Sequence, residues 1–192
     1  MRDKSLERAQ VMRSLIRILT FFIPCQRLRK QVRQGLICWW YSFPVRQKAS
    51  KVGKGFRTDA PSVVTATTYI GDGVMGHGFR IHGGGRVEIG NHVQMGMELL
   101  ILAQNHNYEG ERLPFDYDYT LKDVIIGDSV WIGAQVTILP GTTIGEGAII
   151  QARSVVHGEI PPCAIAGGNP AKVFAWRDKA HYERLKAEGK FV

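Results

Sequence analysis

A six-residue repeat in the second half of the chain limits the folds that it can adopt. From Ile126 the sequence divides into the hexads IGDSVW, IGAQVT, ILPGTT, IGEGAI, IQARSV and VHGEIP. The first position is Ile or Val in all six, and the fifth is mostly small or β-branched. Earlier segments follow the same pattern: IGDGVM, IGNHVQ, MGMELL and ILAQNH, which begin at Ile70, Ile89, Met95 and Ile101. A period of six matches neither an amphipathic helix nor a flat strand.

Each hexad describes a short strand followed by a corner, so three hexads close one triangular coil. The β-branched first position points into the triangle, and Gly tolerates the corner backbone. Coils stack at about the 4.8 Å strand spacing, and each one buries the faces of its neighbours. The sequence therefore predicts a mainly β protein, a parallel β-helix. We expect roughly five coils, about 25 Å long, between Val64 and about Ile165. The Gly-rich stretch 76–87 fits the repeat poorly.

The repeat is interrupted once, after Ile101. The next register residue is Ile126, 25 positions on instead of 18, which predicts that about seven residues leave the coil within NYEGERLPFDYDYTLKD. We place this inserted loop at about 107–124. His106 lies where the prism gives way to the loop, a natural place for a cleft. A neutral imidazole there suits proton removal near pH 7.

Stacking of coils adds two expectations about His106. Residues 18 apart lie one above the other while the register holds, so Glu88 should lie beneath His106 and could orient its ring. A solvated, outward-facing Glu88 is the alternative. Trp131, 25 positions beyond His106, should lie one coil further on, as a site residue or as a packing residue at a subunit contact.

The chain divides into three expected parts. Residues 1–50 form a basic amphipathic helical segment, residues 51–165 form the β-helix, and residues 166–192 form a linker and a C-terminal helix. In the first part a helical apolar stripe precedes Pro24, which ends the helix: Met12, Leu15, Ile16, Leu19, Phe22 and Ile23. A second stripe follows: Leu28, Val32, Leu36 and Trp39. The linker PPCAIAGGNPAKV should end the repeat, and the last helix covers residues 177–190.

The formal charge of +8 belongs to the first part of the chain. Residues 1–50 hold eleven Lys and Arg against two acidic residues, a charge of +9, which leaves −1 for the remaining 142 residues. The β-helix is therefore not a basic nucleic-acid binder, and we expect no nucleic-acid partner. The basic helices with Trp39 and Trp40 favour either contact with a membrane surface or packing on the first coil or between subunits. We expect a cytoplasmic protein, with peripheral contact at the inner membrane surface as one of these alternatives.

The sequence resembles the hexapeptide-repeat acyltransferases. The resemblance rests on Asn105–His106, on the run IGDSVWIGAQVTILPGTTIGEGAII from Ile126, and on IPPCAIAGGNPAKV near the end. It is strongest to the maltose, galactoside and capsular-polysaccharide O-acetyltransferases. The resemblance implies a left-handed β-helix and homotrimers with an active site between two subunits. It also implies acetyl-CoA as co-substrate and no metal.

The resemblance also assigns roles to single positions. His106 matches the general base, and Trp131 and the backbone of Ala134 match positions near the thioester and the reacting carbonyl, where N–H groups could hold an oxyanion. Further matches run along CoA: Ala152, Asn169, Pro170 and Lys172. The family's usual Lys is replaced by Gly158, whereas Arg153 is gained and joins the expected CoA contacts. Four residues are candidate acceptor contacts: His82, Asn105, Tyr108 and Phe115.

Together these features predict an acetyl-CoA-dependent O-acetyltransferase that acts on a sugar hydroxyl of a cell-surface polysaccharide, its precursor or a glycoside. N-acetylation of an amino sugar nucleotide is the alternative on the same prism. A metal hydratase would need three converging His, and the spacing of His77, His82, His92 and His106 is not that of the gamma-type carbonic anhydrases. A prism without activity is a further alternative. Nothing near Cys163 in sequence would activate its thiol, so we expect direct transfer between the substrates.

Overall fold

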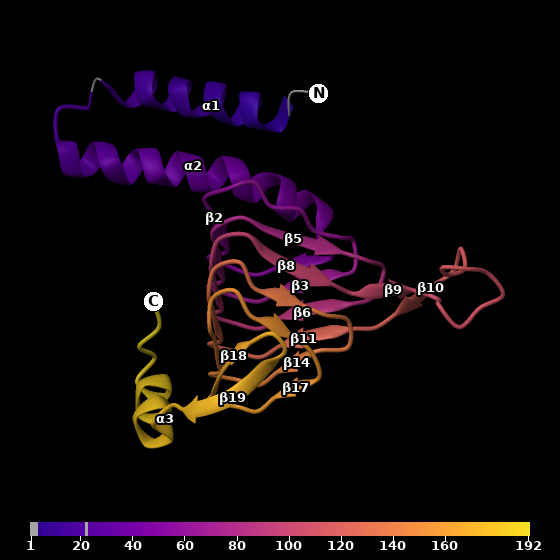
Figure 1. Ribbon diagram of the computed structural model, residues 1–192. Helices are drawn as coiled ribbons and strands as arrows, with labels where there is room; N and C mark the ends of the chain where they lie inside the picture. The colour runs from indigo at the N-terminus through magenta and orange to yellow at the C-terminus, as the bar shows by residue number, and fades with distance from the viewer. Residues whose placement is uncertain (1–3, 22) are drawn as a thin grey trace.

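The computed structural model describes residues 4–21 and 23–192, with side chains from residue 7 onward, and Phe22 of the expected stripe lies outside these residues. Two antiparallel helices lie at one end of a triangular β-helix, and a third helix packs beside its other end (Figure 1). The helices are α1 (Lys4–Phe21), α2 (Gln26–Lys48) and α3 (Lys179–Ala187). The prediction of a mainly β protein with helices at both ends is confirmed.

Three parallel sheets form the faces of the prism, and their strands alternate along the chain. Sheet A contains β1 (Lys51–Val52), β3 (Thr68–Ile70), β6 (Val87–Ile89), β11 (Val124–Ile126), β14 (Thr143–Ile144) and β17 (Glu159–Ile160). Sheet B contains β2 (Arg57–Thr58), β4 (Met75–Gly76), β7 (Gln94–Met95), β12 (Trp131–Ile132), β15 (Ile149–Ile150), β18 (Ala164–Gly168) and the antiparallel β19 (Ala171–Trp176). Sheet C contains β5 (Phe79–His82), β8 (Leu99–Leu102), β13 (Thr137–Ile138) and β16 (Val155–Val156).

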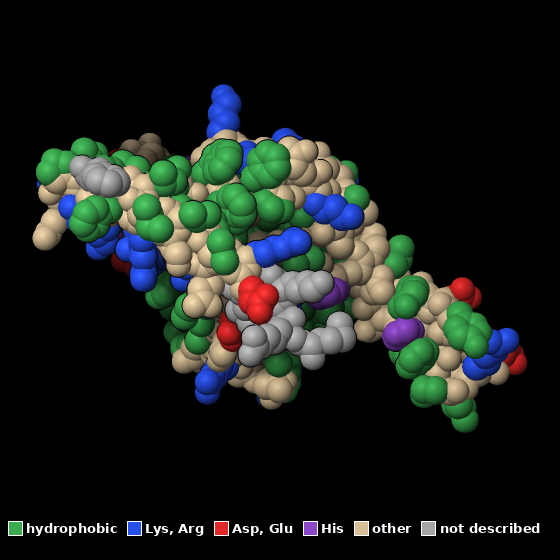
Figure 2. Space-filling model, turned by 90° about the horizontal axis from the view of Figure 1, so that it is seen from above, with side chains coloured by type: hydrophobic (Ala, Val, Ile, Leu, Met, Phe, Trp, Pro, Cys, Tyr) green, Lys and Arg blue, Asp and Glu red, His purple; other side chains and the backbone are tan. Residues whose placement is uncertain are grey.

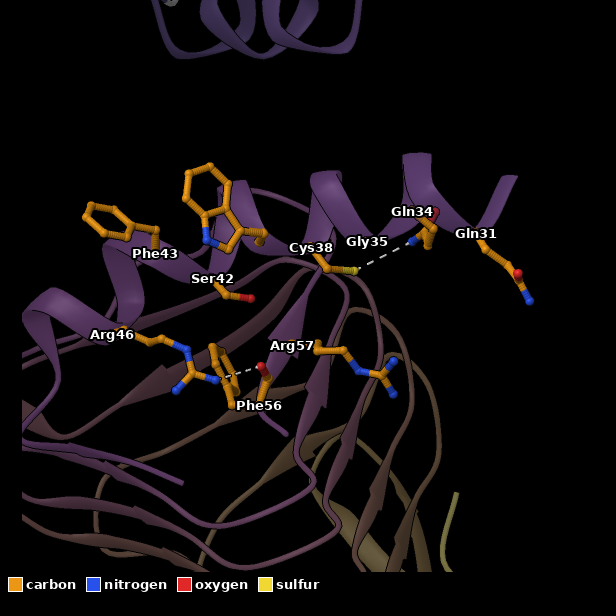
Figure 3. Close-up of a pocket in the computed structure, with 10 residues that line it drawn as sticks. Gln31, Gln34, Gly35, Cys38, Ser42, Phe43, Arg46, Phe56 and Arg57 are labelled. Carbon is orange, nitrogen blue, oxygen red and sulfur yellow. Dashed lines mark hydrogen bonds between the residues drawn. The ribbon is translucent and has the colours of Figure 1, made fainter. Parts of the chain in front are cut away.

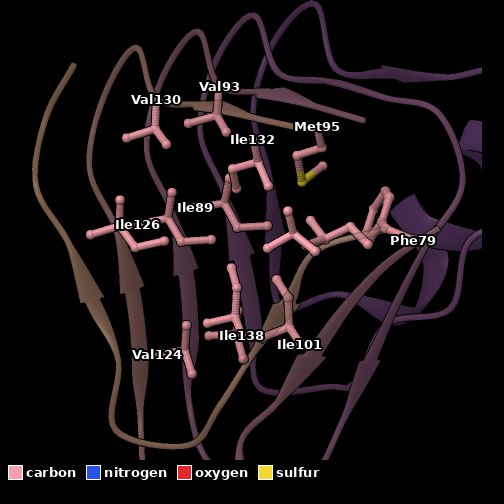
Figure 4. Packing of buried hydrophobic residues seen from close by; sticks show 14 of the residues in the cluster. Phe79, Ile89, Val93, Met95, Ile101, Val124, Ile126, Val130, Ile132 and Ile138 are labelled. Carbon is pink, nitrogen blue, oxygen red and sulfur yellow. The ribbon is translucent and has the colours of Figure 1, made fainter. Parts of the chain in front are cut away.

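The hexad pattern places the core as predicted. The first-position residues Ile126, Ile132 and Ile138 are each no more than 1% exposed and point into the prism (Figure 4). Ile144, Ile150 and Val156 repeat this arrangement in the next coil. The solenoid begins at Lys51, the expected start of the β-helix part, and it has about six turns where roughly five were expected from Val64 onward. The Gly-rich stretch 76–87 contributes a regular strand, β5, which pairs in parallel with β8.

Coil length varies along the prism, which the count of 18 did not allow for. Cα partners are 18 residues apart at Ile126↔Ile144 but 20 apart at Ile81↔Ile101. Across the insertion they are 37 apart, as at Leu100↔Thr137. The insertion therefore removes nineteen residues from the coil, and the expectation of about seven was wrong.

The segment expected to be a linker continues the β-helix. β18 pairs with β15 in parallel, and the chain then turns back so that β19 pairs with β18 in antiparallel fashion. Pro and Gly therefore end the hexad pattern but not the sheet. Helix α3 docks on the corner between sheets A and B. Tyr182 donates a hydrogen bond to Glu146 (2.8 Å), and the Arg177 Nε donates to the Gly147 carbonyl (2.6 Å).

Helix α2 closes the N-terminal end of the prism. Val45 is 1% exposed and belongs to the main core, and the Ser42 hydroxyl accepts a hydrogen bond from the Thr58 N–H (3.0 Å). The Arg46 guanidinium donates to the Phe56 carbonyl (3.0 Å), as the view of the pocket beneath α2 shows (Figure 3). Capping of the first coil, one of the two alternatives for this segment, is therefore part of what α2 does.

Candidate active site

The insertion forms a two-stranded hairpin at the corner between sheets C and A. Its strands β9 (Gln104–His106) and β10 (Tyr119–Leu121) pair in antiparallel fashion, with His106 opposite Tyr119. The His106 ring stacks on Phe115, with ring centroids 3.8 Å apart, and its centroid lies 4.7 Å from that of Tyr119. Aromatic rings therefore hold the imidazole plane, while the ring nitrogens accept or donate no hydrogen bond within the described chain. The imidazole is exposed and available for proton transfer.

The hairpin is internally ordered but largely uncovered. The Asn107 N–H donates to the Asp118 carbonyl, the Asp116 N–H donates to the Asn107 carbonyl, and the Asp116 side chain accepts a hydrogen bond from the Glu111 N–H (2.9 Å). Several apolar side chains nevertheless face solvent: Tyr108, Leu113, Phe115, Tyr117, Tyr119 and Leu121. The expected acceptor residues Asn105, Tyr108 and Phe115 thus lie on one element with His106. The fourth, His82, ends β5 and pairs with Leu102, just before the hairpin.

Glu88 does not lie beneath His106, so that expectation was wrong. Its Cα partners are Tyr69 and Ile125 in sheet A, because the coil lengths around it are 19 and 37 residues instead of 18. Its carboxylate forms an ion pair with the Arg86 guanidinium (2.5 Å), which in turn lies over the Tyr69 ring. Glu88 is a half-exposed member of a surface network, as the alternative interpretation held.

Trp131 is also placed elsewhere than predicted. It is the first residue of β12, and its Cα partners are Gln94 and Ile149 in sheet B. Sheet B is the face of the prism opposite the corner that carries the hairpin. Figure 1 shows the hairpin and β18 of sheet B on opposite sides of the prism. Trp131 is 55% exposed and borders a groove of about 460 Å³ between sheet B and α3.

A strip of bare backbone follows Trp131 at the corner between sheets B and C. A Cβ at Gly96 would lie 2.6 Å from the Ala134 nitrogen, and one at Gly133 would lie 2.5 Å from the Ala152 nitrogen, so neither position can carry a side chain without displacing backbone. The N–H groups of Ala134 and Ala152 donate to no acceptor within the described residues. Close stacking of this kind recurs at other corners, as at Gly71 and Gly127, so coil packing accounts for the glycines. The two N–H groups without an acceptor are hydrogen-bond donors that a ligand could use, and we call this stretch of backbone the cradle.

The remaining expected CoA contacts lie toward the C-terminal end of the same face. Ala152 and Arg153 form the corner below Ala134, and the Arg153 Nε donates to the Gln135 amide oxygen (2.9 Å). Asn169 and Pro170 form the turn between β18 and β19, and the exposed Lys172 is the second residue of the return strand. Trp131 and Lys172 therefore lie in sheet B, Ala134, Ala152 and Arg153 lie at its corner with sheet C, and Asn169 and Pro170 lie in the turn that ends it, whereas the hairpin carries His106.

Sequence reasoning missed a His–Asp pair on sheet B. The His77 Nδ1 lies 3.1 Å from both carboxylate oxygens of Asp59, which also accepts a hydrogen bond from the Gln34 amide (3.4 Å). His77 borders the same groove as Trp131. Asp59 is 18 residues before His77, so the coil length of 18 contained this signal. The stacking of Phe191 on His92, with centroids 3.9 Å apart, had no signal in the repeat.

The thiol of Cys163 is not suited to nucleophilic attack. Cys163 is 5% exposed, and burial raises the pKa of its thiol, which keeps it protonated near neutral pH. Among the residues that the structure describes, no three His, Cys, Asp or Glu side chains converge in a way that could hold a metal ion.

Comparison with known proteins agrees with this architecture. Residues 123–158 match the family model described as "Bacterial transferase hexapeptide (six repeats)". Residues 123–158 therefore carry the hexapeptide repeat of this family within the triangular β-helix, in agreement with the resemblance found in the sequence.

Three similar proteins illustrate the relationship. "Putative acetyltransferase YvoF" of Bacillus subtilis is 38% identical over 101 residues, 53% of this chain and 54% of that protein. "Putative lipopolysaccharide biosynthesis O-acetyl transferase WbbJ" of Escherichia coli is 52% identical over 50 residues, 26% of each chain. The solved structure of a galactoside acetyltransferase in complex with coenzyme A has a TM-score of 0.64 and 22% identity, and the match covers 94% of this chain and 86% of that one. The chain thus spans about half the length of the first curated relative.

Proposed function

We propose that this protein is an acetyl-CoA-dependent O-acetyltransferase that acts on a sugar hydroxyl of a cell-surface polysaccharide, its precursor or a glycoside. One arrangement carries the proposal: a free imidazole on an ordered hairpin at one corner of the prism, and a cradle with two free N–H groups at another corner. A base and oxyanion donors are what acyl transfer requires. The names of the similar proteins support acetyl transfer and a carbohydrate acceptor.

The two halves of this site belong to different subunits in our proposal. His106 and Trp131 lie on opposite sides of one prism, so one chain alone does not bring both to a reaction. In a homotrimer each subunit presents one patch to a different patch of its neighbour, and the ring closes after three contacts. The uncovered apolar side chains of the hairpin, such as Leu113 at 96% exposure, support insertion into such a contact.

The proposed roles follow from the chemistry of each group. Acetyl-CoA supplies an acetyl thioester, whose carbonyl is the electrophile. His106 takes the proton from the acceptor hydroxyl while the hydroxyl oxygen forms a bond to that carbonyl. The free N–H of Ala134 donates to the carbonyl oxygen as charge develops there. The C–S bond then breaks, and the leaving CoA thiolate takes the proton from His106 to leave as the thiol. Trp131 and Ala152 would line the path of the co-substrate, and Lys172 and Arg153 offer positive charge to its phosphates.

The acceptor would approach from the hairpin side. Tyr108 and Phe115 can stack on a sugar ring, and the Asn105 amide can bond to its hydroxyl groups. His82 lies at the base of the hairpin. Phe115 also stacks on His106, so it positions the base as well.

A screen of acceptors with acetyl-CoA tests the proposal and separates it from N-acetylation. Hydroxyl acceptors (simple glycosides and lipopolysaccharide fragments) are compared with amino sugar nucleotides, and release of the CoA thiol is followed. Faster release with hydroxyl acceptors is expected. Transfer to amines alone would favour the N-acetyltransferase alternative, and no transfer to either class, with CoA bound, would contradict the proposal.

A further inference from the structure

An uncovered apolar surface extends over both N-terminal helices. It forms a shallow groove of about 860 Å³ whose lining is mostly apolar: Val11, Met12, Leu15, Ile16, Leu19, Leu36, Trp39 and Trp40, with Glu7 and Arg8 at its edge. Trp39 is 65% exposed, and Leu19 is 70% exposed. Figure 2 shows hydrophobic side chains gathered over this helical end of the molecule. The exposed apolar members of this lining form what we call the helical apolar surface: Val11, Leu15, Leu19, Leu36, Trp39 and Trp40.

Helical geometry separates this surface from the contacts that hold the helices together. In α1, Met12 and Ile16 are buried against Ile37 and Tyr41 of α2. Val11 and Leu15 lie one position earlier in each turn, so they fall on the adjacent face, which no described residue covers. The single stripe expected from the sequence is thus two stripes with different tasks. The outer stripe is a contiguous apolar patch, whereas the exposed apolar side chains of most monomeric soluble proteins are scattered singly.

The same helices carry an unbalanced positive charge. Residues 1–50 have a formal charge of +9, and the rest of the chain has −1. None of the ion pairs in the described part of the chain involves a Lys or Arg of either helix. A second hollow on the helix pair gathers four of these basic residues: Arg17, Arg29, Lys30 and Arg33. The occupant of the helical apolar surface must therefore accept apolar side chains and also supply negative charge.

The need for both an apolar environment and negative charge decides which partner fits the helical apolar surface. A second copy of the helices would bring another charge of +9 to the contact, and the near-neutral β-helix supplies no compensating acidic surface. A bilayer with anionic lipids provides both an apolar layer and negative charge. We propose that α1 and α2 dock on the surface of an anionic membrane, with the helical apolar surface in the headgroup region. This inference does not depend on the transferase proposal.

The docking is peripheral. Between residues 4 and 21 and from residue 23 on, no helix is both long and apolar enough to span a bilayer. Trp39 and Trp40 have amphipathic rings of the kind that lie at headgroup level, and they are adjacent in α2. Basic side chains add to the attraction, which is electrostatic and therefore weakens as salt screens it.

Sedimentation of the full chain with vesicles tests the proposal. Wild-type protein should bind phosphatidylcholine vesicles at least about tenfold more tightly when they contain phosphatidylglycerol. The binding should fall when salt is raised from about 0.01 M to about 1 M. Replacing Leu15→Ser together with Trp39→Ser should reduce binding at least about tenfold. The matched control replaces Val63→Ser and Phe174→Ser, which are similarly exposed on the β-helix and β19, and should bind as wild type does.

A second pair of variants changes only charged side chains, so it tests vesicle binding without altering the apolar packing of the helices. Arg13→Glu with Arg17→Glu should weaken binding to anionic vesicles at least about tenfold, whereas Lys179→Glu with Arg184→Glu on α3 should not. Circular dichroism verifies the fold of each variant. Equal binding to neutral and anionic vesicles, or no binding at all, would overturn the proposal. If the Leu15 and Trp39 replacements lower the mass of the assembly in solution while wild type ignores vesicles, the surface is a subunit contact instead.

Discussion

At the scale of the residue, the environment of His106 is unusual because aromatic rings hold it and no acid does. Phe115 stacks on one side and Tyr119 lies nearby, yet the ring nitrogens have no partner in the described chain. A base that is fixed by stacking keeps both nitrogens free, so a neighbouring subunit or the acceptor can supply the hydrogen bond. Glu88 lies in another sheet and forms an ion pair with Arg86.

Replacing His106→Ala should reduce acetyl transfer by about 100-fold or more, because the acceptor hydroxyl loses its base. His157→Ala is the matched control, since His157 is an exposed histidine in a coil corner outside the hairpin. Turnover with a carbohydrate acceptor and the mass of the assembly are measured together. Near-normal turnover of the His106→Ala protein, with its assembly intact, would show that another group is the base.

At the scale of the element, the hexad divides each strand into inward, buried positions and outward, exposed positions, and substitutions at the two should differ in their effect on stability. Ile132→Ala should lower the free energy of unfolding by about 2–5 kcal/mol, because the side chain is fully buried and its removal leaves a cavity. Ile125→Ala, at a 44% exposed position of the same repeat, should cost less than about 1 kcal/mol. Denaturant unfolding measures both. An equal loss in the free energy of unfolding for both variants would mean that the repeat does not determine which residues form the core.

The packing of α3 on the prism should weaken at alkaline pH. Burial and the hydrogen bond to Glu146 raise the pKa of Tyr182 from 10.0 to about 12. A raised pKa in the folded state stabilises docking below pH 10, and this contribution disappears as pH rises from about 10 to about 12. Near-ultraviolet circular dichroism should show α3 undocking over this range. Tyr182→Phe removes the titrating group, so an unchanged pH dependence in that variant would contradict the assignment.

The elements also show what the sequence could predict. The strands from Ile126 onward were predicted correctly because six residues per side is a local rule that burial of Ile enforces. Which residues stack on one another in neighbouring coils was not predicted correctly, because stacking depends on the length of every coil between two residues. Coils of 16, 18, 19, 20 and 37 residues occur, so a spacing of 18 misplaced Glu88 and a spacing of 25 misplaced Trp131. The same count would have found Asp59 and His77, whose coil has the standard length.

At the scale of the whole molecule, three parts of the chain that follow one another along the prism axis have different roles. The helices close the first coil and present a basic apolar surface, the middle coils carry the hairpin and the Trp131 face, and α3 packs on a corner near the end. If both proposals hold, membrane docking and acetyl transfer occur on different parts of the prism. Vesicle binding should then survive His106→Ala, and acetyl transfer to a small glycoside should survive the paired Arg13 and Arg17 changes.

The central claim is that hairpin and cradle meet across subunits, and complementation tests it most directly. His106→Ala and Trp131→Ala proteins are each assayed alone, then unfolded, mixed in equal amounts and refolded together. If each site takes its hairpin from one subunit and its cradle from the next, about one quarter of the sites in random trimers are intact. The account predicts recovery to about one quarter of wild-type activity. Activity no higher than that of the two variants refolded separately would contradict it, because a site within one chain cannot be repaired by mixing.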